Sequence, residues 1–129
     1  MCPADDNVAD PPRRIGKVLL VGAGPGDPGL ITLRGVECLR QADVVLYDYL
    51  VNPVIAEHAP DHATLVCLGK HGGGTRLWSQ DELNRTLVDY AHAGKTVVRL
   101  KGGDPAVFAR GGEGVAYLAA HDVPVEIVP

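Results

Sequence analysis

The stretch Thr96-Val97-Val98-Arg99-Leu100-Lys101-Gly102-Gly103-Asp104-Pro105 decides the fold, because in it an apolar run ends in a glycine-rich turn. Residues 97–100 are predicted to form a buried strand. The paired glycines allow backbone conformations closed to other residues, and the proline fixes the exit from the turn. Ligands of open α/β sheets bind outside the carboxyl ends of the strands, so this turn is a candidate site by position. A lone Gly-Gly-Asp is also typical of an ordinary strand-to-helix turn.

The same pattern recurs along the chain, where short apolar runs alternate with segments of helical periodicity. Further strands are predicted at residues 17–21, 43–47, 64–68 and 123–128. This alternation predicts an α/β, three-layer domain, with a mostly parallel sheet of about five strands and helices on both faces.

Helix boundaries are indicated by capping residues. Thr32 begins one helix, and Asn52-Pro53 begins a short helix that is expected to run to Ala59. Residues 79–82 read Ser-Gln-Asp-Glu, a capping box, and Gly94 ends the helix that follows. A last helix is expected from about residue 112 to residue 120, with three residues facing inward: Val115, Leu118 and Ala119.

Composition limits the function classes. The chain has 129 residues, enough for one domain at 15–129 behind a disordered leader at 1–14. The formal net charge of −4 argues against a general nucleic-acid binder, and no apolar run is long enough to span a membrane. Three scattered cysteines fit reduced thiols of the cytoplasm better than disulfides or a metal site: Cys2, Cys38 and Cys67.

The glycine loop at residues 22–29 superficially resembles a dinucleotide-binding fingerprint. Pro25 and Pro28 stiffen the loop, its third glycine comes one residue early, and Asp27 would repel a phosphate. We therefore interpret it as the rigid wall of a cleft. Polar residues follow four predicted strands and should gather along one sheet edge: Asp27, Asp48, Lys70 and Asp104.

Six segments occur in a fixed order: residues 21–28, 42–48, 69–70, 80–84, 97–105 and 110–113. Together they resemble the tetrapyrrole methylase family, most closely its uroporphyrinogen-III C-methyltransferases, from residue 17 to the last residue. The resemblance implies transfer of methyl groups from S-adenosyl-L-methionine to two carbons of uroporphyrinogen III. The products would be precorrin-2, for siroheme and cobalamin synthesis, and S-adenosyl-L-homocysteine.

The same resemblance implies roles for particular residues. Asp48 matches the proton acceptor of the family and Lys70 its proton donor, although on position alone the two could pair with each other or cap helices. The expected cofactor contacts are Pro25, Gly102, Gly103, Asp104 and Val107, with no metal. Basic residues near the strand ends would complement the carboxylates of the tetrapyrrole substrate: Lys70, His71, Arg76, Lys101 and Arg110.

The family has two domains, with the cofactor between them, so the chain corresponds to the N-terminal domain and is predicted to be inactive alone. A homodimer of the complete enzyme is expected. Four departures from the family pattern bear on substrate contacts: Tyr49, His71, Ala106 and Ala109. The alternatives are another methyltransferase of the family, of precorrin or diphthine type, a non-catalytic binding or assembly module, and, more remotely, a NAD-dependent oxidoreductase.

Overall fold

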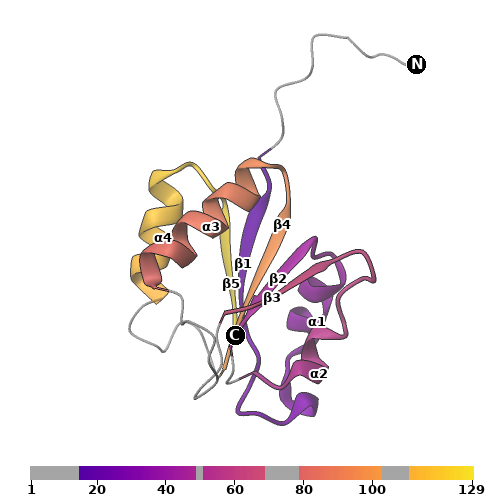
Figure 1. Ribbon diagram of the computed structural model, residues 1–129. Coiled ribbons are helices and arrows are strands. Elements are labelled where there is room, and N and C mark those ends of the chain that lie inside the picture. Colours follow the sequence, from indigo (N-terminus) through magenta and orange to yellow (C-terminus); the bar gives the residue numbers. More distant parts are fainter. Residues whose placement is uncertain (1–14, 49–50, 69–78, 103–110) are drawn as a thin grey trace, which may run out of the picture.

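A computed structural model describes residues 15–48, 51–68, 79–102 and 111–129 of the chain. A five-stranded sheet crosses the molecule in the order β3-β2-β4-β1-β5, and every strand pair is parallel (Figure 1). The strands are β1 (Lys17–Gly22), β2 (Val44–Tyr47), β3 (Thr64–Cys67), β4 (Thr96–Lys101) and β5 (Val125–Val128). The helices are η1 (Pro28–Leu30, a 3-10 helix), α1 (Leu33–Arg40), α2 (Pro53–Ala56), α3 (Gln80–His92) and α4 (Gly111–Ala120).

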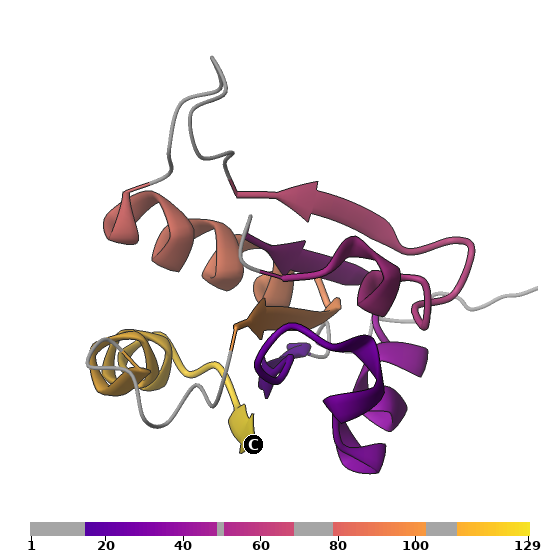
Figure 2. The same ribbon diagram turned by 90° about the horizontal axis from the view of Figure 1, so that it is seen from below.

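Helices cover both faces of the sheet, as predicted. Seen from below, α1 and α2 lie on one side of the sheet while α3 and α4 lie on the other (Figure 2). On the first side, Leu39 and Ile55 pack with Leu19 and Val98 of the sheet. On the second side, α3 and Leu118 of α4 pack against the alternate residues of the same strands. Two separate apolar cores therefore form, one on each face.

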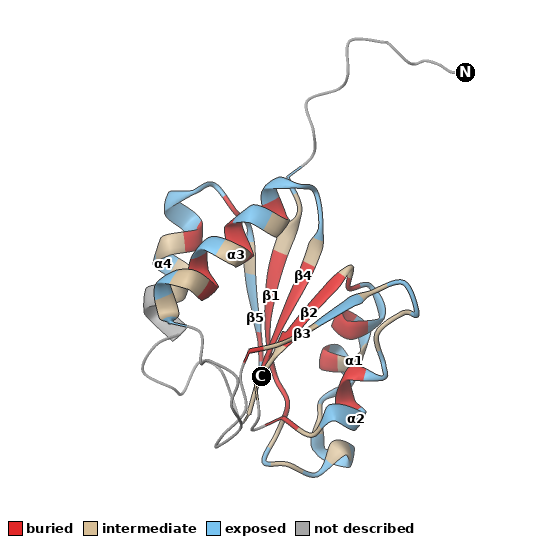
Figure 3. Cartoon of the chain, viewed as in Figure 1, coloured by how far each residue is buried: buried red, intermediate tan, exposed pale blue. Residues whose placement is uncertain are grey.

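Burial follows the strand order. The inner strands β1, β4 and β2 are buried along most of their length, whereas the edge strands β3 and β5 carry exposed positions (Figure 3). Strands covered on both faces are expected to be continuously apolar, which explains the unbroken runs in the sequence. A single charged side chain interrupts this pattern in the buried part of β4, that of Arg99.

The helix ends confirm the predicted caps. The Thr32 hydroxyl accepts a hydrogen bond from the Gly35 amide at 3.0 Å. Ser79 and Glu82 form a reciprocal capping box at 3.1 Å in each direction. Gly94 adopts a positive φ of 86° just after α3, a conformation that favours glycine at a helix end.

Two details differ from expectation. α2 ends at Ala56 and not at Ala59, because the next three amides bond to carbonyls three residues back, which closes tight turns ahead of Pro60. Ala119 is exposed on α4 and not buried, while Tyr117 packs against the core in its place.

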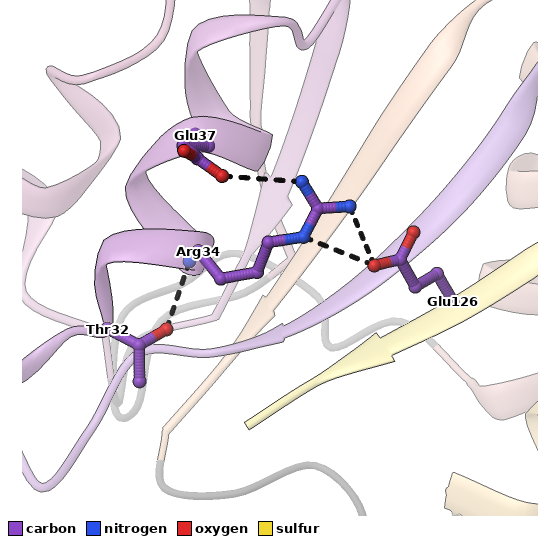
Figure 4. Close-up of polar contacts among 5 residues, drawn as sticks. Thr32, Arg34, Glu37 and Glu126 are labelled. Atoms are coloured by element: carbon purple, nitrogen blue, oxygen red, sulfur yellow. Dashed lines mark hydrogen bonds and ion pairs between the residues drawn. The ribbon is translucent and has the colours of Figure 1, made fainter.

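A polar cluster ties α1 to the edge strand β5. Arg34 donates from Nη2 to Glu126 Oε2 at 2.7 Å and from Nη1 to Glu37 Oε1 at 3.5 Å, directly beside the Thr32 cap (Figure 4). The Thr32 hydroxyl also donates to the Pro129 carbonyl at 3.2 Å. These contacts fix the end of β5 against the start of α1, near the carboxyl edge of the sheet.

Candidate functional site

The candidate site lies where β2 and β4 end, in the middle of the sheet. The two strands are neighbours, and their last paired residues are Tyr47 and Leu100. The chain leaves them in opposite directions, because β2 leads to α2 on one face and β4 leads to α4 on the other. Such a switch point opens a crevice at the carboxyl ends of the strands, where α/β proteins bind ligands.

Asp48 stands at this switch point and is held by an arginine from the adjacent strand. Arg99 donates from Nη2 to Asp48 Oδ2 at 3.5 Å. The same guanidinium donates from Nη1 to the carbonyl of Leu100, which lies at the end of β4. The Asp48 side chain is 20% exposed and that of Arg99 only 9%. The carboxylate is therefore accessible at the edge, and its cationic partner lies beneath it.

Burial makes the charge of Arg99 costly. Desolvation lowers the pKa of the Arg99 guanidinium below its ordinary value, and the negative charge of Asp48 and the hydrogen bond to it act in the opposite direction. Leu20 and Leu46 flank Arg99 on the same face of the sheet. The desolvation cost of a cation among these apolar side chains is therefore offset by the negative charge of Asp48.

Two of the predicted cofactor-binding residues lie in adjacent loops. The amide of Ala23, just after β1, donates to the carbonyl of Lys101 at 2.7 Å. This bond brings together the loop that carries Pro25 and the one that begins at Gly102. Pro25 is exposed and Gly102 is half-buried, so both can be reached from the carboxyl edge.

The loop after β1 has a shape that depends on its glycines. Gly24 and Gly26 have φ angles of 81° and 121°. A Cβ at Gly24 would lie 3.1 Å from the carbonyl oxygen of Leu30, whereas one at Gly26 would meet nothing within 4 Å. The carboxylate of Asp27 accepts from the Gly29 amide at 2.8 Å and caps η1. Asp27 therefore has a structural role that explains its presence.

The remaining predicted site residues lie outside the described part of the chain: Gly69, Lys70, His71, Arg76, Gly103, Asp104, Val107 and Arg110. The departures at Tyr49, Ala106 and Ala109, and the leader at 1–14, lie outside it as well. The meeting of Asp48 with Lys70 stays a prediction. Lys101 is described and lies at the last position of β4.

Sequence reasoning did not assign a role to Arg99. The available signal was its position, a charged residue inside an otherwise apolar strand, three positions before Gly102. A charge at a buried position is rare without a partner. The partner could have been sought among the acidic residues at the ends of other strands, of which Asp48 is one.

Other kinds of site receive no support from the described residues. Within 15–48, 51–68, 79–102 and 111–129, no group of three or more His, Cys, Asp or Glu side chains could hold a metal ion. No helix in these ranges is long and apolar enough to cross a membrane. Cys38 is buried and has a free thiol, and Cys67 is half-buried.

Comparison with known proteins identifies relatives of the whole folded part. The family model of the Tetrapyrrole (Corrin/Porphyrin) Methylases matches residues 17–129. The chain is 50% identical over 120 residues to the siroheme synthase of Zymomonas mobilis, covering 93% of this chain and 25% of that protein. It is also 50% identical to the uroporphyrinogen-III C-methyltransferase of Methanocaldococcus jannaschii, covering 88% of this chain and 47% of the relative.

A solved structure supports the same relationship. The uroporphyrin-III C-methyl transferase of Thermus thermophilus, crystallised with S-adenyl homocysteine, superposes with a TM-score of 0.74 and 51% identity. The superposition covers 88% of this chain and 48% of that one. The chain thus spans about a quarter to a half of the length of the relatives that it matches.

Proposed function

This chain belongs to the tetrapyrrole (corrin/porphyrin) methylases, and from that premise we propose that it is the N-terminal α/β domain of an enzyme that methylates uroporphyrinogen III. The methyl donor is S-adenosyl-L-methionine, and the product is precorrin-2, the precursor of siroheme and cobalamin. One observation carries the proposal: the Asp48 carboxylate, the loop that carries Pro25, and Gly102 lie together at the carboxyl ends of neighbouring strands. Relatives that are named for this reaction support it.

The described residues fit this cofactor. A Cβ at Gly26 would meet nothing within 4 Å, and Pro25 and Gly102 are accessible, so a ligand can approach the backbone of this edge closely. The one acidic group of the first loop, Asp27, is already bonded to the Gly29 amide. Bound S-adenosyl-L-methionine supplies a methyl group on a sulfonium, which is activated without help from a metal or a nucleophilic side chain. Further contacts are proposed for Gly103, Asp104 and Val107.

The protein has two tasks in such a transfer: to align the reacting carbon with the methyl group and to manage protons of the ring system. We assign proton acceptance to Asp48, because its carboxylate is accessible at the edge and is held by Arg99. Proton donation is assigned to Lys70, which follows β3 after Leu68 and Gly69. Neither task needs a redox centre.

The substrate carries several carboxylates, and basic residues follow the strands of this edge. Lys101 ends β4, while Lys70, His71, Arg76 and Arg110 come from the loops that leave β3 and β4. A local excess of cations on an acidic chain would steer an anionic substrate towards the crevice. Raised salt should therefore weaken substrate capture more than cofactor binding.

The test is methyl transfer from S-adenosyl-L-methionine to uroporphyrinogen III, followed by product mass. The present chain would be assayed beside a version extended through the second domain of the family, each with and without Asp48→Asn. We expect two added methyl groups from the extended version alone and strong loss of activity with Asp48→Asn. Glu57→Gln, which changes an exposed acidic residue just after α2, is the matched control.

The other outcomes are equally informative. A product from a precorrin or diphthine substrate, with none from uroporphyrinogen III, would move the enzyme elsewhere in the family. No product from any of these substrates would favour a binding or assembly module. Activity of the present chain alone would refute its assignment as an incomplete domain.

We also propose that the complete enzyme is a homodimer of the cytoplasm. The free thiol of Cys38 supports a reducing compartment. Sedimentation equilibrium of the extended protein would test the assembly, and a monomer at micromolar concentration would refute it.

A further inference from the structure

We propose that Arg99 is the positioning residue of the site, which holds the Asp48 carboxylate in register with the end of β4, directly before Gly102. This inference rests on the proposed function, since Asp48 and Gly102 act there as proton acceptor and cofactor contact. Arg99 itself would touch neither substrate nor cofactor.

One guanidinium bonds both to the Asp48 carboxylate, just past the end of β2, and to the Leu100 carbonyl, at the end of β4. The next helices along the chain, α2 after β2 and α4 after β4, pack on opposite faces of the sheet. Arg99 therefore joins the two segments at the last point where they are still neighbours. A planar guanidinium with several fixed donors suits such a double contact, and the ammonium of a lysine suits it less well.

Arg99 occupies a position whose surroundings favour an apolar residue. Its neighbours in the register, Leu20 and Leu46, belong to an apolar core, and an apolar residue between them would avoid the desolvation of a charge. Replacing buried ion pairs by apolar residues is often neutral or stabilising. Stability alone therefore gives a weak reason for Arg99, whereas fixing the orientation of an accessible carboxylate gives a specific one.

The guanidinium of Arg99 is not available for direct contact with ligands. The Arg99 side chain is 9% exposed, less than half the exposure of the Asp48 side chain above it. Two of its nitrogens already donate to Asp48 and to Leu100. Its influence on the reaction must therefore pass through the groups that it holds, and a change at Arg99 should matter only while Asp48 is intact.

The experiment compares Arg99→Met and Arg99→Lys in the extended enzyme, each with Asp48 and with Asp48→Asn. Methionine keeps most of the length of the side chain without its charge. Lysine keeps the charge but lacks the planar guanidinium with its several donors. Arg85→Met removes an exposed arginine of α3 and serves as the control. The measurements are kcat, KM for S-adenosyl-L-methionine, and calorimetric binding of S-adenosyl-L-homocysteine. The side-chain NMR spectrum of ¹⁵N-labelled arginine is recorded for each protein.

We expect Arg99→Met to lower kcat by about 100-fold, the effect of a small misplacement of a reacting group, with KM and product binding nearly unchanged. Arg99→Lys should restore part of the rate. In the Asp48→Asn background, Arg99→Met should cause no further loss. The Arg99 guanidinium resonances should shift with Asp48→Asn, while those of Arg85 should not.

Several results would overturn the inference. General damage to the fold would be indicated by any of three results. These are an equal fall in kcat from Arg99→Met with Asp48 and with Asp48→Asn, a kcat of Arg99→Lys no higher than that of Arg99→Met, or a loss of S-adenosyl-L-homocysteine binding as large as the loss of kcat. Unshifted Arg99 resonances in Asp48→Asn would show that the contact is absent. An inactive unsubstituted enzyme would instead refute the proposed function, and with it the catalytic part of this inference. The NMR spectrum would still decide whether Arg99 holds Asp48.

Discussion

Asp48→Asn should destabilise the chain because it leaves the buried guanidinium of Arg99 without its counter-charge. Arg99→Met should cost less, because it removes a desolvated cation and leaves a carboxylate that is 20% exposed to water. The effect of Arg99→Met on the free energy of unfolding should even have opposite signs in the unsubstituted chain and in the Asp48→Asn variant. It should destabilise the unsubstituted chain and stabilise the Asp48→Asn variant, from which it removes the uncompensated charge.

The magnitude follows from the geometry of the pair. Unit charges 3.5 Å apart attract by about 5 kcal/mol at an effective dielectric constant of about 20. Asparagine can still accept a hydrogen bond from Arg99, and the half-buried carboxylate of Asp48 is partly hydrated, so much of that attraction is offset. We expect Asp48→Asn to lower the free energy of unfolding by about 2–3 kcal/mol, just below the range for fully buried pairs. Arg99→Met should cost about 1 kcal/mol and should return about 1 kcal/mol in the Asp48→Asn background.

Urea denaturation at neutral pH, followed by far-UV circular dichroism, would measure the free energy of unfolding of the unsubstituted chain, of Asp48→Asn, of Arg99→Met and of the double variant, which together form a double-mutant cycle. Arg85→Met, on the exposed side of α3, controls for the loss of any arginine. The coupling should also persist at high salt, because a buried pair is screened less than a surface pair. An identical effect of Arg99→Met in both backgrounds, to within about 0.5 kcal/mol, would mean that the two charges do not interact and would refute this reasoning.

Two further predictions concern other parts of the fold. Gly16→Ala should lower the melting temperature strongly, because its Cβ would lie 1.8 Å from the carbonyl oxygen of Lys95. Gly29→Ala should lower it less, because its Cβ would meet only the Asp27 side chain, at 3.3 Å. Equal falls in melting temperature for the two variants would contradict the geometry. Burial raises the pKa of the Cys38 thiol above its ordinary value, so the stability due to this group is complete below the unfolded pKa of about 8.5 and is lost as the pH rises towards the folded value. Unfolding measured from about pH 8 to about pH 10 should therefore show a smaller fall for Cys38→Ala than for the unsubstituted chain, and parallel curves would contradict the role of Cys38.

Local signals predicted the elements well, because each depends on residues close in sequence. Thr32 and the Ser79–Glu82 box cap their helices as expected, and the apolar runs became strands within about two residues. The end of α2 was predicted too late, since the helix gives way to tighter turns before the Pro60 that was expected to stop it. Ala119 was predicted to face inward but is exposed, because a small apolar residue is compatible with either face of a helix.

Long-range features could not be predicted in the same way. Alternation indicates parallel strands, but nothing local in β1 or β4 specifies that they lie side by side. The site was predicted through residues at strand ends, and Asp48, Pro25 and Gly102 do lie at one edge of the sheet. The contact between Asp48 and Arg99 was missed, because it depends on the pairing of β2 with β4 across about fifty residues of chain.

The strand order also governs how the chain can assemble. β4 lies between β1 and β2, so these two strands never pair with each other. Of the four pairings among the described strands, only that of β2 with β3 joins strands consecutive in the chain, and none of the four is an antiparallel hairpin that could start the sheet. Contacts this distant in sequence close slowly, because the connecting loops must first lose entropy. During synthesis on a ribosome, β1 and β2 cannot be joined through β4 until the chain has emerged as far as Lys101, the last residue of β4. Until then, the strand edges of β1 and β2 that later pair with β4 stay unpaired.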